Sequence, residues 1–273
     1  MLTLYIIVLT PSSNSKLIID KINNNNEKFS SHYSYIAHAG GGINGETYTN
    51  SLEALQKSIN NNYKLIELDL LVTSDKKLLA YHDWKSLSEL CKIKESELQV
   101  LKISEIKKCK FSINNNDYTF LDGSKINKIF TENKNLILIT DKIQDYKILK
   151  KEFKFQDRIF VETFGIANYI LAKLYGIKNP MYNYTIGRRN IIYVKFFNIK
   201  LITTSTDNLV RYKSIFSNFI KDKKIIFSYS SNSKNFNLKH IGKTTSAVYT
   251  DFWNLKTKSC DQLNIDKSKC QKY

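Results

Sequence analysis

The chain has 273 residues, of which 42% are hydrophobic and 12% aromatic, and its formal net charge at pH 7 is +17. This composition supplies enough apolar side chains for a full core and excludes wholesale disorder. The 9 glycines and 2 prolines exclude collagen-like and proline-rich architectures. No stretch approaches the roughly 20 apolar residues of a membrane-spanning helix.

The positive charge favours attraction to phosphate-bearing substrates and is compatible with peripheral contact to an anionic membrane. Nearly all of it comes from lysine, because the chain has only four arginines, Arg158, Arg188, Arg189 and Arg211. Guanidinium forks are the groups that read bases and phosphates bidentately. We therefore do not expect a nucleic-acid-binding protein.

Residues 1–33 are expected to form an N-terminal segment peripheral to the main domain, and residues 257–273 a C-terminal tail. Within the N-terminal segment, residues 1–13 resemble part of an export signal but lack its basic beginning. A short strand and a misplaced start are the alternatives. Export or membrane association is slightly favoured over a cytoplasmic location.

The four cysteines, Cys91, Cys109, Cys260 and Cys270, contain no C-x-x-C pair, which argues against a zinc site of the usual spacing. Two disulfides and four reduced thiols stay open as alternatives.

Between residues 34 and 256, short apolar runs alternate with longer Lys/Glu-rich amphipathic stretches such as Ser51–Asn60 and Lys142–Phe153. The apolar runs are Ser34–Ala39, Leu65–Val72, Lys77–Tyr81, Leu136–Thr140, Arg158–Thr163, Met181–Ile186, Lys200–Thr204, Ile225–Tyr229 and Ala247–Thr250. Strands that alternate with helices indicate βαβ units, and about eight units without a linker indicate a closed barrel. The sequence predicts one α/β domain with the (β/α)8 TIM-barrel fold. The charged stretch Lys92–Cys109 is expected to be helical as well.

Two acidic residues lie at alternate positions of the run Leu65–Val72. On a strand, Glu67 and Asp69 face the same side. Carboxylates held side by side at the end of an apolar strand repel each other and lose hydration, and a hard divalent cation bound through oxygen relieves both costs. Taken alone, the pair also fits a polar rim of the sheet.

Two histidines flank this pair. His38 closes the first predicted strand, and His82 follows the run Lys77–Tyr81. Because the carboxyl ends of barrel strands meet at one face, we expect both imidazoles to share a pocket with Glu67 and Asp69. Two imidazoles beside a carboxylate-bound cation suit phosphodiester cleavage, one as base or nucleophile and the other as acid.

This block resembles the N-terminal signature of the glycerophosphodiester phosphodiesterase family, whose barrel is shared with phosphatidylinositol-specific phospholipase C and venom sphingomyelinase D. The family signature reads H-R-G, E-N-T-x-x-A, E-x-D-V and T-x-D-x-x-x-V-x-x-H-D. The matching text here is A-H-A-G at His38, N-S-L-E-A from Asn50, E-L-D-L from Glu67, and T-S-D from Thr73 leading to His82-Asp83. Fainter matches lie at Leu136–Lys142, Phe160–Gly165, Ile225–Asn232 and Ala247–Phe252.

The resemblance implies metal-dependent cleavage of a glycerophosphodiester or a related phosphodiester to an alcohol and a phosphomonoester. The related substrates are lipid headgroups and phosphate-linked glycans. A cyclic phosphate product, as in a lyase, is compatible with the same pocket. A catalytically inactive barrel that binds a phospholipid headgroup or a glycan is the alternative function.

By the same resemblance, His38 and His82 are the acid/base pair. The divalent cation, Mg²⁺ or Ca²⁺, is held by Glu67, Asp69 and Asp141. The resemblance also implies a substrate contact for Lys142, as the cation that binds phosphate.

Asn50 is expected to cap the helix after it or to contact the substrate. Asp251 is expected to have either a supporting role at the site or a structural one.

The chain departs from the family pattern at three places. Ala39 replaces the arginine of H-R-G, which contacts phosphate in the family, and Tyr229 replaces a tryptophan. Asp141 directly precedes Lys142, whereas the family places its acidic residue two positions before the lysine. Neighbours on a regular strand face opposite sides, so Thr140 is the alternative occupant of the ligand position.

Overall fold

The computed structural model describes residues 19–22, 32–93, 100–185, 187–261 and 268–271, so the signal-like residues 1–13 lie outside the described part. Eight parallel strands close into a barrel in which neighbours along the chain are neighbours around the ring, and the last strand pairs with the first. This confirms the predicted TIM barrel. The strands are β1 (Tyr35–Ala37), β2 (Leu65–Glu67), β8 (Ile137–Thr140), β9 (Ile159–Phe164), β10 (Pro180–Asn183), β11 (Leu201–Ser205), β12 (Ile225–Tyr229) and β13 (Ala247–Thr250).

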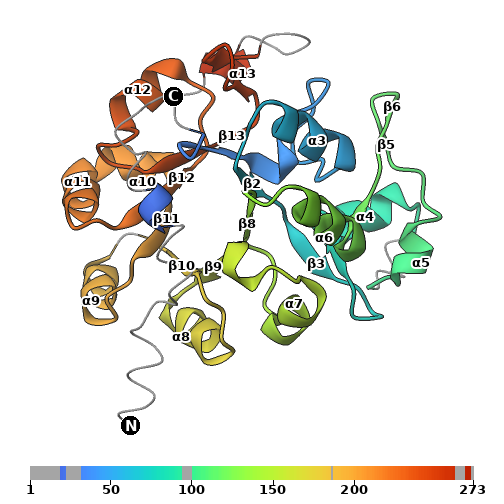
Figure 1. The fold of residues 1–273 in the computed structure, drawn as a ribbon, viewed down its shortest axis with the longest axis horizontal. Coiled ribbons are helices and arrows are strands. Elements are labelled where there is room, and N and C mark those ends of the chain that lie inside the picture. Colours follow the sequence, from blue (N-terminus) through green and yellow to red (C-terminus); the bar gives the residue numbers. More distant parts are fainter. Residues whose placement is uncertain (1–18, 23–31, 94–99, 186, 262–267, 272–273) are drawn as a thin grey trace.

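Helices surround the barrel (Figure 1), and several of them begin at a capping side chain. Ser51 accepts a hydrogen bond from the backbone N–H of Ala54, and Asp122 accepts one from Lys125, which satisfies donors that a helix start leaves unpaired. The helices are α3 (Leu52–Asn60), α6 (Gly123–Glu132), α7 (Tyr146–Glu152), α8 (Ile166–Leu174), α9 (Arg188–Phe196), α10 (Thr206–Arg211), α11 (Lys213–Lys221) and α12 (Lys234–His240).

The core has two layers because strand side chains alternate between faces. On β12, Ile225 and Phe227 belong to the cluster that fills the barrel, whereas Ile226 belongs to the cluster between barrel and helices. Ile22, from the short N-terminal helical turn at residues 19–22, is fully buried in the inner cluster. No described helix combines the length and the apolar character needed to cross a membrane.

Between β2 and α6 the chain leaves the barrel and forms an excursion, residues 70–122, beside it (Figure 1). Its strands β3, β4 and β7 make a three-stranded antiparallel sheet. The elements of the excursion are β3 (Leu70–Val72), β4 (Leu78–Ala80), α4 (Trp84–Leu90), α5 (Ile103–Ile106), β5 (Ser112–Ile113), β6 (Asn116–Asp117) and β7 (Leu121–Asp122).

The excursion corrects three expectations. The run Leu65–Val72 is two strands, since β2 ends at Glu67, and the run Lys77–Tyr81 contains a hairpin strand outside the barrel. A short apolar run has the same pattern in a barrel strand and in a hairpin, so sequence periodicity does not separate them. Of the stretch Lys92–Cys109, only Ile103–Ile106 is helical among the described residues.

The four cysteines are paired. Cys91 bonds to Cys109 within the excursion, and Cys260 bonds to Cys270 after the last barrel strand. Cys260 belongs to the small antiparallel pair β14 (Trp253–Asn254) and β15 (Ser259–Cys260), and Cys270 to α13 (Ser268–Gln271). The disulfide alternative therefore holds in the structure.

His240 generates a testable pH dependence of stability away from the active face. Its ring is 2% exposed, stacks on Phe236 with centroids 4.4 Å apart, and shares a 2.9 Å hydrogen bond between Nδ1 and Thr244 Oγ1. Burial, helped by nearby lysines, lowers the pKa of His240 to about 4. The imidazole of the unfolded chain is protonated below about pH 6.5, whereas that of the folded protein stays neutral down to about pH 4. The unfolded state therefore binds more protons in this range, and the free energy of unfolding decreases as pH falls from about 6.5 to about 4.

We expect His240→Gln to remove this dependence. The difference in unfolding free energy between wild type and variant, measured by urea titration, should shrink by about 3 kcal/mol between pH 7 and pH 4. Carboxylates titrate in both proteins and cancel in the difference. A difference that stays constant across this range would show that the imidazole is not held neutral by the fold.

Candidate active site

A cavity of about 280 Å³ opens where the carboxyl ends of the barrel strands meet. The two predicted catalytic histidines and the three predicted metal-binding carboxylates line this cavity, together with a set of aromatic and polar side chains. The lining residues are His38, Tyr48, Glu67, Asp69, His82, Asp141, Lys142, Glu162, Phe164, Asn183, Tyr229, Ser230 and Tyr249.

Three carboxylates converge in this cavity. Glu67 ends β2, Asp69 lies two residues further on, and Asp141 follows the last residue of β8. One carboxylate oxygen from each lies within 4.8 Å of those from the other two. Glu67 and Asp69 are each 4% exposed, so the fold holds these acidic groups together away from bulk water.

Two backbone and side-chain contacts fix the first two carboxylates. The backbone N–H of Ala39 donates to Glu67 Oε2 at 2.6 Å, from a residue whose φ is +47°. Asn50 donates from Nδ2 to Asp69 Oδ2 at 2.8 Å, and its Oδ1 accepts from the Asp69 N–H at 3.0 Å. The expectation that Asn50 caps α3 is wrong, because Ser51 occupies the cap. A contact of Asn50 with substrate stays a prediction.

Asp141 reaches the cluster because β8 ends one residue before it. The alternation that would turn its side chain away applies only within a strand, and Asp141 lies beyond Thr140, the last strand residue. Thr140 is fully buried, and its Oγ1 accepts a hydrogen bond from the Leu70 N–H at 3.3 Å. The geometry thus brings Asp141 beside Glu67 and Asp69, whereas the Thr140 hydroxyl is bonded to the backbone of Leu70.

The carboxylates perturb one another. Burial first, and then the charges of Asp69 and Asp141, raise the pKa of Glu67 well above its usual range. Burial and the charge of Asp69 raise the pKa of Asp141 to about 6. Lys142 partly offsets this crowding, with Nζ 3.3 Å from Asp141 Oδ2 and 3.8 Å from Asp69 Oδ1.

The cluster fits a hard divalent cation. All three donors are carboxylates, the ligand type that Mg²⁺ and Ca²⁺ prefer. Asp141 Oδ1 is buried and has no hydrogen-bond partner among the described residues, which leaves an oxygen lone pair for a cation. A bound cation would also relieve the repulsion that raises the pKa of Glu67.

His38 stands at the end of β1 in a short 3-10 turn, η1 (His38–Gly40). Its Nδ1 lies 3.0 Å from Asp251 Oδ1, which gives Asp251 a supporting role at the site. Burial lowers the pKa of His38, but the hydrogen bond and charge of Asp251, with the charges of Asp69 and Asp141, outweigh burial and raise it. The Asp251 contact leaves Nε2 as the nitrogen available for proton exchange.

His82 enters the same cavity by a route that differs from the predicted one. The hairpin of β3 and β4 starts directly after Asp69 and returns to it, since the Tyr81 N–H donates to the Asp69 carbonyl at 2.9 Å. His82 therefore emerges beside Asp69 although it follows no barrel strand. Its Nδ1 lies 2.8 Å from Asp83 Oδ2, and Asp83 also caps α4. Each imidazole is thus oriented by an aspartate.

Sequence reasoning missed several cavity residues. Glu162 is 6% exposed and accepts a 2.5 Å hydrogen bond from Asn183, and burial raises its pKa to about 7. An acidic residue inside the apolar run of β9 was the available signal for it. Tyr48 lies in the loop before α3, where no periodic pattern marks it.

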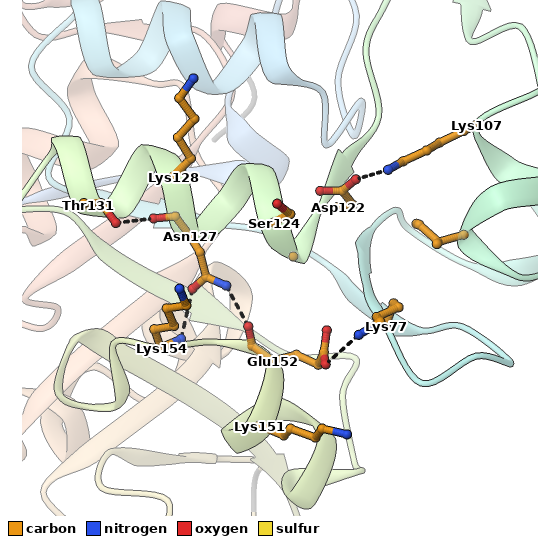
Figure 2. A pocket seen from close by; sticks show the side chains of 12 residues that line it. Lys77, Lys107, Asp122, Ser124, Asn127, Lys128, Thr131, Lys151, Glu152 and Lys154 are labelled. Carbon is orange, nitrogen blue, oxygen red and sulfur yellow. Dashed lines mark hydrogen bonds and ion pairs between the residues drawn. The ribbon is translucent and has the colours of Figure 1, made fainter.

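A larger cavity of about 610 Å³ lies on the flank of the barrel, between α6, the end of α7 and the β3–β4 turn (Figure 2). It is rich in lysine, and its two carboxylates are ion-paired, with Lys77 Nζ 3.2 Å from Glu152 and Lys107 Nζ 2.7 Å from Asp122. None of the predicted catalytic or metal-binding residues lines it. The predicted catalytic and metal-binding residues line the smaller cavity instead.

The model of the glycerophosphoryl diester phosphodiesterase family matches residues 38–231. The fold is similar to that of a Galdieria sulphuraria protein assigned to the glycerophosphodiester phosphodiesterases, at a TM-score of 0.66 and 15% identity, with 82% of this chain and 96% of that chain covered. No curated protein matched the chain.

Two further structures are similar. A phosphodiesterase of Oleispira antarctica, solved in complex with the product sn-glycerol-3-phosphate, has a TM-score of 0.61 and 14% identity over 82% of this chain and 94% of its own. The glycerophosphodiester phosphodiesterase of Thermotoga maritima has a TM-score of 0.58 and 19% identity over 82% and 95%. These likenesses support the fold, and the family model covers more than half of the chain. The chain therefore belongs to the glycerophosphoryl diester phosphodiesterase family of phosphoric diester hydrolases.

Proposed function

We propose that the protein cleaves a glycerophosphodiester, or a closely related phosphodiester, in a reaction that depends on a divalent cation held by Glu67, Asp69 and Asp141. One observation carries this proposal: three carboxylates and two aspartate-backed imidazoles line a single cavity at the carboxyl end of the barrel. Family membership supplies the reaction class, and the Oleispira antarctica relative is described with glycerol phosphate as product.

A bound cation supplies charge neutralisation for the phosphate in this mechanism. Lys142 lies at the edge of the carboxylate cluster, 34% exposed, and is placed to bind a phosphate oxygen. This chain lacks the arginine that contacts phosphate in the family, because the residue after His38 is Ala39. Lys142 is the cation that we assign to the phosphate in its place. The single ammonium then shares the phosphate charge with the metal site.

Proton transfer falls to the imidazoles. His38 and His82 each engage an aspartate through Nδ1, so each turns Nε2 to the substrate. One imidazole takes the proton of the attacking hydroxyl, which belongs to water or to the glycerol itself, and the other gives a proton to the leaving alcohol oxygen. The bond from phosphorus to the attacking oxygen forms as the bond to the leaving oxygen breaks. Water gives a phosphomonoester, and the glycerol hydroxyl gives a cyclic phosphate.

Metal binding can be tested without turnover. We expect Mg²⁺ or Ca²⁺ to raise the melting temperature of the wild type at pH 7.5, because the cation stabilises the folded state that gathers the carboxylates. Glu67→Gln and Asp141→Asn should lose at least tenfold in affinity by calorimetry while the metal-free proteins stay folded. Asp222→Asn, an exposed residue outside the cavity, is the matched control.

Thr140→Val should bind the cation as the wild type does. If it loses the cation while Asp141→Asn retains it, the third ligand has been misassigned.

Activity is tested on glycerophosphocholine and on bis(p-nitrophenyl) phosphate. We expect turnover that EDTA abolishes and that an added divalent cation restores. His38→Ala and His82→Ala should each lower kcat by about 10²–10⁴-fold, the usual contribution of a positioned acid or base. His32→Gln, an exposed histidine, should leave kcat unchanged.

Phosphorus NMR of the product separates a monoester from a cyclic phosphate. Headgroup binding without turnover of any phosphodiester across a panel of metals would instead identify a binding barrel.

A further inference from the structure

An aromatic side chain stands between the two imidazoles. The ring centroid of Tyr48 lies 4.5 Å from that of His38 and 5.2 Å from that of His82, and both pairs are edge-on, with interplanar angles of 74° and 83°. Tyr48 also lines the cavity. A single ring thus spans the gap between the groups to which the proposed function gives the two proton transfers.

The backbone of Tyr48 leads directly into buried residues beside the carboxylate cluster. Its φ is +58°, in the left-handed region that a bulky non-glycine residue adopts only at a cost. The next three residues, Thr49, Asn50 and Ser51, are at most 1% exposed. Asn50 is joined to Asp69 by two hydrogen bonds. The unfavourable conformation is therefore fixed by neighbours that also orient a carboxylate of the cluster.

The two histidines depend on Tyr48 to different degrees. The His38 side chain is 14% exposed and has a second aromatic neighbour, Tyr249, at 5.9 Å. The His82 side chain is 42% exposed and pairs with Asp83, itself 45% exposed. Among the described residues, Tyr48 is the aromatic side chain in ring contact with His82. The more exposed imidazole therefore has Tyr48 as its main lateral support inside the cavity.

We propose that Tyr48 is a positioning residue that holds His82 at a fixed separation from His38. The inference rests on the proposed function for its catalytic consequence, whereas the positioning itself is a structural claim. The recorded contacts are made by the ring, so phenylalanine should preserve them and an aliphatic side chain should not. Tyr48 is 47% exposed, so replacing its side chain removes little packing from the core.

The kinetic test compares Tyr48→Phe with Tyr48→Leu on glycerophosphocholine. Tyr48→Leu should lower kcat by about 30-fold or more, because displacement of a reacting group by an ångström costs up to about 10²-fold, while KM changes less than threefold. Tyr48→Phe should recover most of that loss. Tyr175→Leu, at a partly exposed tyrosine after α8, is the control for a general effect of tyrosine loss. A kcat for Tyr48→Leu within twofold of wild type would overturn the proposal.

A spectroscopic test needs no turnover. The chain has 4 histidines, so its imidazole C–H signals can be assigned with single His→Gln variants. Tyr48→Leu should shift the signals of His38 and His82, through loss of the ring current and through His82 movement, and leave those of His240 in place. Tyr48→Phe should shift them far less.

Unmoved His38 and His82 signals in Tyr48→Leu would refute the positioning role even in an inactive protein. A wild type that cleaves no phosphodiester would refute the proposed function instead, and the spectra would still decide the role of Tyr48.

Discussion

The active face depends on the enforced proximity of carboxylates at the ends of β2 and β8. Glu67, Asp69 and Asp141 bring their oxygens within 4.8 Å of one another, and two of the three are almost fully buried. Burial, and after it the neighbouring like charges, raise the pKa values of Glu67 and Asp141, and both effects favour protonation or a bound cation. The unfolded chain ionises these groups near pH 4, so metal-free stability falls as pH rises from about 4 towards 6. The fold thus accepts a loss of stability from these ionised carboxylates and keeps them together at the site.

Hydrogen bonds from neighbouring polar groups maintain this proximity. The N–H of Ala39 and the amide of Asn50 each hold one carboxylate, and the side chain of Thr140 accepts the N–H of Leu70 where the chain leaves the barrel. Asp251 and Asp83 do the same for the imidazoles. Both histidines, Asp69 and Asp141 lie in loops just beyond strands, where backbone geometry is free of the strand alternation.

The barrel and most of the cavity could be predicted from the sequence because they rest on patterns with a physical period. Apolar runs and amphipathic stretches predict strands and helices, and residues at the carboxyl ends of parallel strands must gather at one face, as His38 and Glu67 do. His82 lies in the predicted cavity, but the reason for the prediction was wrong, because β4 belongs to an antiparallel hairpin outside the barrel. The sequence of a short apolar run does not show which strands it pairs with. Tyr48 and the cap at Ser51 depend on single-residue backbone geometry, which periodicity does not encode.

The excursion that carries His82 divides the proposed acid/base pair between two structural units. His38 belongs to the rim of the closed barrel, whereas His82 is delivered by an antiparallel sheet whose neighbouring helices are joined by the Cys91–Cys109 disulfide. The placement of this side unit against the barrel therefore sets the position of His82 relative to His38. Under the proposed function, a substitution on the excursion would alter turnover without contacting the proposed metal ligands.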